Sequence, residues 1–421
     1  MTKTLPFTKE QIETLAREHP TPFYVYDEAG IRARTRALSE AFSWNKGFKQ
    51  HFAVKALPNP VILAAMREEG SGADCSSLPE LSLADKAGIK GENIMFSGND
   101  TPAEEFIEAK KRGAIINLDA LEHLDYLEKH AGLPELLCFR YTPIGLKLGN
   151  AIIGNPKESK FGLTREQLFE GYRAAKEKGI KRFGLHTMPV SNELRVEYHL
   201  EAVRELFTVA KELEQVGITF EFINLGGGIG IPYRPEEKEF DLMAYANGVR
   251  ELAREILGDS IPSLHMECGR YITGPFGYLV SRVRHVKQSY KNYVGLDASM
   301  ANLMRPGMYG AYHHITILEK ENMNDLRSRS LGTYDVVGSL CENNDKFAID
   351  RRLPTIEPGD IVVIHDAGAH AHAMGFNYNG KLRSAEFLLR HAGASGGGGL
   401  PELKLIRRAE TVDDYFATLK F

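Results

Sequence analysis

A repeated alternation of short apolar runs with helix-patterned segments, from about residue 48 to 270, most constrains the fold of this chain. The runs are rich in β-branched and other apolar residues, as strands are. They are HFAV (51–54), GADCSS (72–77), NIMFSG (93–98), AIINLD (114–119), LLCFRY (136–141), RFGLHT (182–187), FEFINL (220–225) and SLHMEC (263–268). The segments between them place charged residues opposite Leu, Ala and Phe at helical spacing. These eight strand–helix units predict an α/β fold, a (β/α)8 TIM-type barrel, with a doubly wound open sheet as the alternative.

The pattern changes after about residue 275 to alternating runs separated by turns, which predicts a mostly β domain. The strand-like segment TPFYVYD (21–27) precedes the barrel, and we expect it to pair with the sheet of this C-terminal domain. The expected division is an N-terminal segment (1–40), a barrel (41–280) and a β domain (281–421). The low-complexity stretch GASGGGGL (393–400) is expected to be a surface loop.

The charge balance argues against nucleic-acid and membrane partners. The 421 residues include 52 Lys and Arg against 56 Asp and Glu, a net charge of −4. Such a chain lacks the long-range attraction on which polyanion binding relies, and no apolar run approaches the length that crosses a bilayer. The four cysteines form no CxxC pair, which fits a reducing compartment. A cytoplasmic protein acting on a small molecule is the expectation.

Lys55 is the first candidate for chemistry, because a TIM barrel carries its active site at the C-terminal ends of the strands. It closes the apolar run HFAVK. Burying an ammonium group lowers its pKa, and a lowered pKa suits a lysine that forms a Schiff base. The alternative is a structural lysine whose head group reaches the rim of the barrel.

Two further candidates follow the last two strands of the predicted barrel. The glycines of LGGGIG (225–230) would let backbone N–H groups converge on an anion, or would simply make a tight turn. Glu267 and Arg270 in ECGR could hold a heterocyclic N–H and a phosphate or carboxylate. Their alternative is a structural ion pair.

Other candidates lie outside the barrel. Cys341 begins the segment CENND after a strand-like run, although a lone cysteine is usually a small buried hydrophobe. Arg305 and Tyr309, in MRPGMYGAY, suit a carboxylate, although either could serve packing instead. The histidines of HDAGAHAH match no zinc spacing, so no metal site is predicted.

These segments together resemble the fold-type III pyridoxal-phosphate-dependent decarboxylases, most closely the diaminopimelate decarboxylases. The resemblance covers nearly the whole chain, and the order and spacing of the motifs make it specific. The motifs are TPFYVYD, FAVKALPN, GADCSSLPEL, MFSGN, SKFGL, LGGGIG, ECGRYI, MRPGMYGAYH, CENND, DAGAH and NYNGKLRSAE. The resemblance implies an alanine-racemase-like barrel followed by a β domain, in a homodimer whose active sites lie at the subunit interface.

The same resemblance implies a role for each matching residue. Lys55 would bind the aldehyde of pyridoxal 5′-phosphate, Glu267 would pair with its ring nitrogen, and Cys341 of the other subunit would donate a proton. The phosphate would be lined by Ser191, Gly226, Gly227 and Gly228, with Cys268 and Gly269 nearby. The distal end of the substrate would be held by Arg270, Arg305, Tyr309 and Glu342.

Three positions depart from the family pattern. Met188 replaces the histidine of GLHxHIGS that normally stacks on the cofactor ring, which a thioether can also cover. Cys268 replaces the proline of EPGR. His370 replaces the tyrosine of DAGAY, and Tyr378 in NYN is a candidate stand-in.

The expected reaction is decarboxylation of meso-2,6-diaminopimelate to L-lysine, the last step of lysine biosynthesis. The two arginines and Glu342 match a distal head that carries both a carboxylate and an ammonium group. The alternatives are a decarboxylase of ornithine, lysine, arginine or carboxynorspermidine type, a non-catalytic relative, and a barrel racemase with the same cofactor.

Overall fold

The computed structural model describes residues 3–143, 159–318, 331–390 and 401–420. The chain divides into two compact units. The barrel unit comprises Arg32–Ile231 and Glu239–Ile272, and the β unit comprises Met1–Ile31, Pro232–Lys238 and Thr273–Phe421. Within the described residues, no helix is long and apolar enough to cross a membrane.

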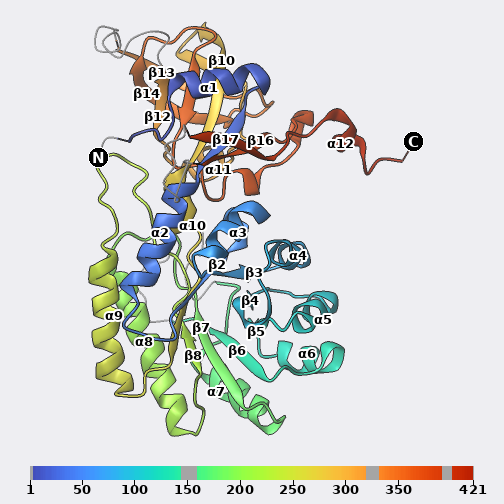
Figure 1. The fold of residues 1–421 in the computed structure, drawn as a ribbon, viewed down its shortest axis with the longest axis vertical. Coiled ribbons are helices and arrows are strands. Elements are labelled where there is room, and N and C mark those ends of the chain that lie inside the picture. Colours follow the sequence, from blue (N-terminus) through green and yellow to red (C-terminus); the bar gives the residue numbers. More distant parts are fainter. Residues whose placement is uncertain (1–2, 144–158, 319–330, 391–400, 421) are drawn as a thin grey trace. The chain divides into compact units, whose positions relative to one another are not determined.

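Eight parallel strands close into a barrel (Figure 1). They are β2 (Lys49–Ala53), β3 (Gly72–Cys75), β4 (Ile94–Phe96), β5 (Ile115–Leu118), β6 (Leu136–Tyr141), β7 (Arg182–Thr187), β8 (Phe222–Asn224) and β9 (Ser263–Met266). The last strand pairs with the first, Lys49 opposite His265 and Gln50 opposite Met266. This pairing confirms the predicted barrel and shows that the open-sheet alternative is wrong.

Helices lie outside the barrel strands (Figure 1). They are α2 (Glu28–Ala41), α3 (Pro60–Glu68), α4 (Leu78–Lys86), α5 (Ala103–Lys111), α6 (His123–Ala131), α7 (Arg165–Glu177), α8 (Val196–Gln215) and α9 (Leu242–Leu257). Their starts are encoded locally: Asn59 caps α3 ahead of Pro60, and Thr164 forms a capping box with Gln167 at α7. The face of α8 that includes Leu206, Phe207 and Leu213 is buried.

The β unit is built on a nine-stranded sheet. Its strands are β1 (Phe23–Asp27), β10 (Gly277–Gln288), β11 (Asn292–Leu296), β12 (Ile315–Leu318), β13 (Leu331–Val337), β14 (Lys346–Pro354), β15 (Ile361–Ile364), β16 (Ala385–Arg390) and β17 (Glu402–Arg407). Strand β1 runs antiparallel to β10 and parallel to β16, so the N-terminal segment joins the C-terminal sheet as expected. The expected loop at 393–400 lies outside the described residues.

The core of the β unit forms where helix α1 (Lys9–Glu18) packs on this sheet. Ile12 and Leu15 of α1 are buried against Phe23 of β1 and Phe387 of β16. Short helices α10 (Arg270–Thr273), α11 (Arg305–Tyr309) and α12 (Val412–Phe416) complete the fold. Helix α11 is five residues long and carries two of the candidate residues, Arg305 and Tyr309.

Candidate active site

Lys55 lies in the 3-10 turn η1 (Val54–Ala56), directly after strand β2. Its Nζ donates a hydrogen bond to Asp74 Oδ2 at 3.3 Å. The Asp74 side chain is only 1% exposed, whereas the Lys55 side chain is 53% exposed. The amine is therefore anchored from one side by a buried carboxylate and accessible from the other.

The expectation that burial lowers the pKa of Lys55 is wrong for this chain. The negative charge of Asp74 raises the Lys55 pKa, outweighing desolvation, and Glu267 adds to the effect. Burial, together with the charge of Glu267, in turn raises the pKa of Asp74. Sequence alone named Lys55 and Glu267 but not Asp74, whose charge has the largest effect on the lysine.

Glu267, which directly follows strand β9, is a buried carboxylate with two hydrogen-bond donors. His186 Nε2 lies 3.0 Å from its Oε2, and Asn224 Nδ2 donates to its Oε1 at 2.7 Å. Burial by itself would raise the pKa of Glu267, but the charge of His186 and its hydrogen bond outweigh burial and lower it. Glu267 therefore keeps its negative charge inside the barrel. The alternative for this segment was a structural ion pair, and the contact that Glu267 makes is with His186.

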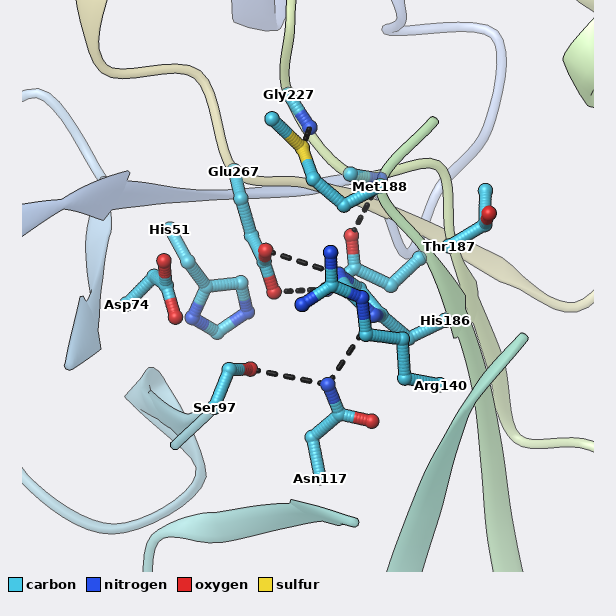
Figure 2. A network of polar contacts seen from close by, with 12 residues as sticks. His51, Asp74, Ser97, Asn117, Arg140, His186, Thr187, Met188, Gly227 and Glu267 are labelled. Atoms are coloured by element: carbon cyan, nitrogen blue, oxygen red, sulfur yellow. Dashed lines mark hydrogen bonds and ion pairs between the residues drawn. The ribbon is translucent and has the colours of Figure 1, made fainter. Parts of the chain in front are cut away.

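A side-chain relay orients His186 (Figure 2). Asn117 Nδ2 lies 3.1 Å from His186 Nδ1 and donates to Ser97 Oγ at 3.0 Å. These contacts hold the His186 ring with its Nε2 facing Glu267 Oε2. The relay thus links Ser97, which follows β4, and residues of β5 and β7 to the buried carboxylate of Glu267.

The glycine loop after β8 lies flush against the segment that follows β7. A Cβ on Gly226 would sit 2.1 Å from Thr187 O, and one on Gly228 would sit 2.4 Å from Val190 O. Both glycines have positive φ, 71° and 89°, so the tight-turn explanation holds at these positions. The Gly227 N–H donates to Met188 Sδ at 3.2 Å (Figure 2). The loop therefore brings bare backbone to the barrel mouth.

The segment after β9 packs against the turn that carries Lys55. A Cβ on Gly269 would sit 2.8 Å from Ala56 Cβ, so only glycine allows this approach. Cys268 is buried, and its backbone N–H donates to Gln50 Oε1. Arg270, at the start of α10, is also buried. The structure thus brings Lys55, Glu267 and the glycine loop into one barrel.

Ser191 follows β7 in the barrel unit, and the remaining predicted residues belong to the β unit. Arg305 is buried at the start of α11, its Nη1 lies 3.0 Å from His313 Nε2, and its guanidinium covers the ring of Tyr233. Cys341 is exposed, so the interpretation as a buried hydrophobe is wrong; its N–H donates to Asn379 Oδ1. Glu342, Tyr309 and Tyr378 are exposed, and His370 has a positive φ of 53°. Their roles stay predictions.

Sequence reasoning missed Asp74, Asn117, His186 and Asn224. Each is a polar residue within an apolar strand, as in GADC (72–75) and FIN (222–224). All four are buried. A polar side chain inside a barrel strand must find a polar partner, and this signal was present in the sequence. Which residues pair depends on strand order and register, which only the closed barrel fixes.

Comparison with known proteins decides what this arrangement is. A model of the pyridoxal-binding domain of pyridoxal-dependent decarboxylases matches residues 28–274, more than half of the chain. The chain belongs to the pyridoxal-dependent decarboxylase family. This confirms the family expected from the motifs, with pyridoxal 5′-phosphate as its cofactor.

Relatives of this decarboxylase align over nearly its whole length. Protein TabA of Pseudomonas amygdali pv. tabaci is 44% identical over 411 residues, 97% of this chain and 94% of TabA. The diaminopimelate decarboxylase of Methanothermobacter thermautotrophicus is 36% identical over 406 residues, 95% of this chain and 92% of that protein. The crystal structure of diaminopimelate decarboxylase from Helicobacter pylori complexed with L-lysine has a TM-score of 0.87 at 31% identity, covering 96% of this chain and 98% of that one.

The barrel residues of this decarboxylase fit the cofactor of the family. Lys55 offers an accessible amine, Glu267 a buried negative charge for a protonated ring nitrogen, and the glycine loop backbone amides for an anion. Asp74 Oδ1 and Asn117 Oδ1 are buried, and no described group donates a hydrogen bond to either. These two oxygens can therefore accept hydrogen bonds from a bound group.

Proposed function

We propose that this decarboxylase converts meso-2,6-diaminopimelate into L-lysine and CO2. Two buried arginines carry the proposal: Arg270 of the barrel unit, at the start of α10, and Arg305 of the β unit, at the start of α11. Together with Glu342 they supply cations for a distal carboxylate and an anion for a distal ammonium group. Relatives named diaminopimelate decarboxylase, one of them solved with L-lysine, support the same substrate.

Each residue proposed for the active site would have its own role in the reaction. The bound cofactor supplies a ring that accepts the electron pair left when the Cα–carboxylate bond breaks and CO2 departs. Lys55 would hold the cofactor covalently until substrate replaces it, and Glu267 would keep a proton on the ring nitrogen. The Cys341 thiol would then deliver a proton to Cα of the product.

Substrate preference gives the first test. Purified enzyme should release CO2 from meso-diaminopimelate with kcat/KM roughly 10- to 100-fold above that for ornithine, lysine or arginine. This ratio corresponds to the free energy of one charge-assisted hydrogen bond to the distal carboxylate, which the other three amino acids lack. Release of CO2 under identical conditions measures this. A preference for any of the other three amino acids would contradict the substrate assignment while leaving the family intact.

A decarboxylase of another amino acid is the second candidate function. Two observations favour it: Met188 and His370 depart from the motifs of the family, and a relative whose name states no reaction, TabA, is 44% identical. The CO2-release assay with a wider panel of amino acids separates the two candidates, because this candidate requires little turnover of diaminopimelate.

The enzyme is proposed to be a cytoplasmic homodimer with shared active sites. Mixing equal amounts of Lys55→Ala and Cys341→Ala protein should restore about a quarter of wild-type activity, because random exchange makes half the dimers mixed and each mixed dimer has one intact site. Activity after exchange, with exchange confirmed by differently tagged subunits, measures this. No recovery would show that each site is built from one chain.

A further inference from the structure

The amide of Gly227 is held by an unusually weak acceptor. Its N–H donates to the thioether sulfur of Met188 at 3.2 Å, whereas the neighbouring Gly226 N–H donates to Asn224 Oδ1 at 2.9 Å. A thioether sulfur accepts hydrogen bonds only weakly. The Gly227 contact is therefore the easier of the two to exchange for another acceptor.

The position of Met188 follows from the backbone around it. The segment Thr187–Val190 and the glycine loop approach so closely that a Cβ on Gly226 or Gly228 would meet a backbone oxygen of that segment at 2.4 Å or less. A side chain at position 188 thus has the glycine loop beside it, as Figure 2 shows. Methionine is unbranched and has flexible torsions, and this one is half-buried, so its sulfur can move away.

We propose that Met188 is a displaceable cap on the Gly227 amide that sets how strongly this decarboxylase prefers the phosphorylated cofactor over its unphosphorylated form. A phosphate oxygen accepts a charge-assisted hydrogen bond, which is about twice as strong as a neutral one, so it would displace the sulfur. Breaking the hydrogen bond between Gly227 and Met188 offsets part of the free energy that the phosphate gains, so the sulfur weakens binding of the phosphorylated cofactor only. The proposal rests on cofactor binding at the glycine loop and is independent of the substrate.

The test compares two ligands on one variant. Apoenzyme is titrated with pyridoxal 5′-phosphate and with pyridoxal, following cofactor absorbance and protein fluorescence rather than activity. In Met188→Leu, which keeps the volume and loses the acceptor, the ratio of the pyridoxal Kd to the pyridoxal phosphate Kd should rise about two- to fivefold. Any contact between residue 188 and the ring affects both ligands and cancels in the ratio.

Two further variants complete the design. Met188→Ala also removes the sulfur and should raise the ratio in the same direction, so the test does not depend on how leucine packs. Met243→Leu changes an exposed methionine on α9 and should leave the ratio unchanged. Thermal unfolding shows that each variant is folded.

The remaining outcomes overturn the proposal. An unchanged or lowered ratio in both Met188 variants would show that the sulfur does not compete with phosphate. Equal weakening of both ligands would assign Met188 to the ring alone. If the wild-type protein binds neither compound, the cofactor assignment itself fails, and this result is distinct from an unchanged ratio in a protein that binds both.

Discussion

Replacing Lys55 with alanine should lower kcat by roughly 10³-fold or more and abolish the absorbance band of lysine-bound cofactor. The reason is covalent: the accessible amine beside buried Asp74 is the group proposed to hold the aldehyde. Steady-state CO2 release and the absorbance spectrum of the purified variant measure the two effects.

Lys55→Arg is the matched variant. A guanidinium keeps a positive charge opposite Asp74, so the buried carboxylate keeps a partner, but it cannot form a Schiff base. We expect this variant to be as inactive as Lys55→Ala while unfolding at a temperature closer to wild type. Substantial activity in Lys55→Arg would show that Lys55 acts through charge alone and would contradict its covalent role.

Replacing Glu267 with glutamine should lower kcat by roughly 10²- to 10³-fold while the cofactor remains bound through Lys55. The buried carboxylate keeps its charge because His186 lowers its pKa. A neutral amide cannot hold a proton on the ring nitrogen in this way, so the ring accepts electrons less readily. Enzyme activity and the spectrum of the bound cofactor, recorded together, separate loss of chemistry from loss of cofactor.

The control for this variant is a carboxylate away from the barrel mouth. Glu201 is exposed on α8, and Glu201→Gln should leave kcat within about twofold of wild type. Because glutamine also sets an NH2 group against one of the two donors at Glu267, the thermal stability of Glu267→Gln must be compared with wild type. Full activity in a folded Glu267→Gln protein would show that ring protonation does not depend on this residue.

Much of the fold could be predicted because each barrel strand carries its own apolar signal. Strands β6 and β7 have the predicted bounds, residues 136–141 and 182–187. Strand β8 (Phe222–Asn224) is shorter at both ends than the predicted run 220–225. Local pattern predicts where a strand lies better than where it ends.

The candidate site could be predicted less completely than the fold. Lys55, Glu267 and the glycines could be identified from the sequence because each of them ends or interrupts an apolar run. The relay from Asn117 through His186 to Glu267 joins strands far apart in sequence, so its pairing depends on barrel closure and register. The prediction that the pKa of Lys55 is lowered was wrong for the same reason, because Asp74 lies on the neighbouring strand.

The most direct test of the account traps the covalent bond itself. The cofactor-loaded enzyme is reduced with borohydride, which makes a Schiff base permanent, then digested and analysed by mass spectrometry. The account predicts a reduced phosphopyridoxyl group on the peptide that carries Lys55. The group on a different lysine, or an unmodified Lys55 peptide from protein that still retained its cofactor, would contradict it.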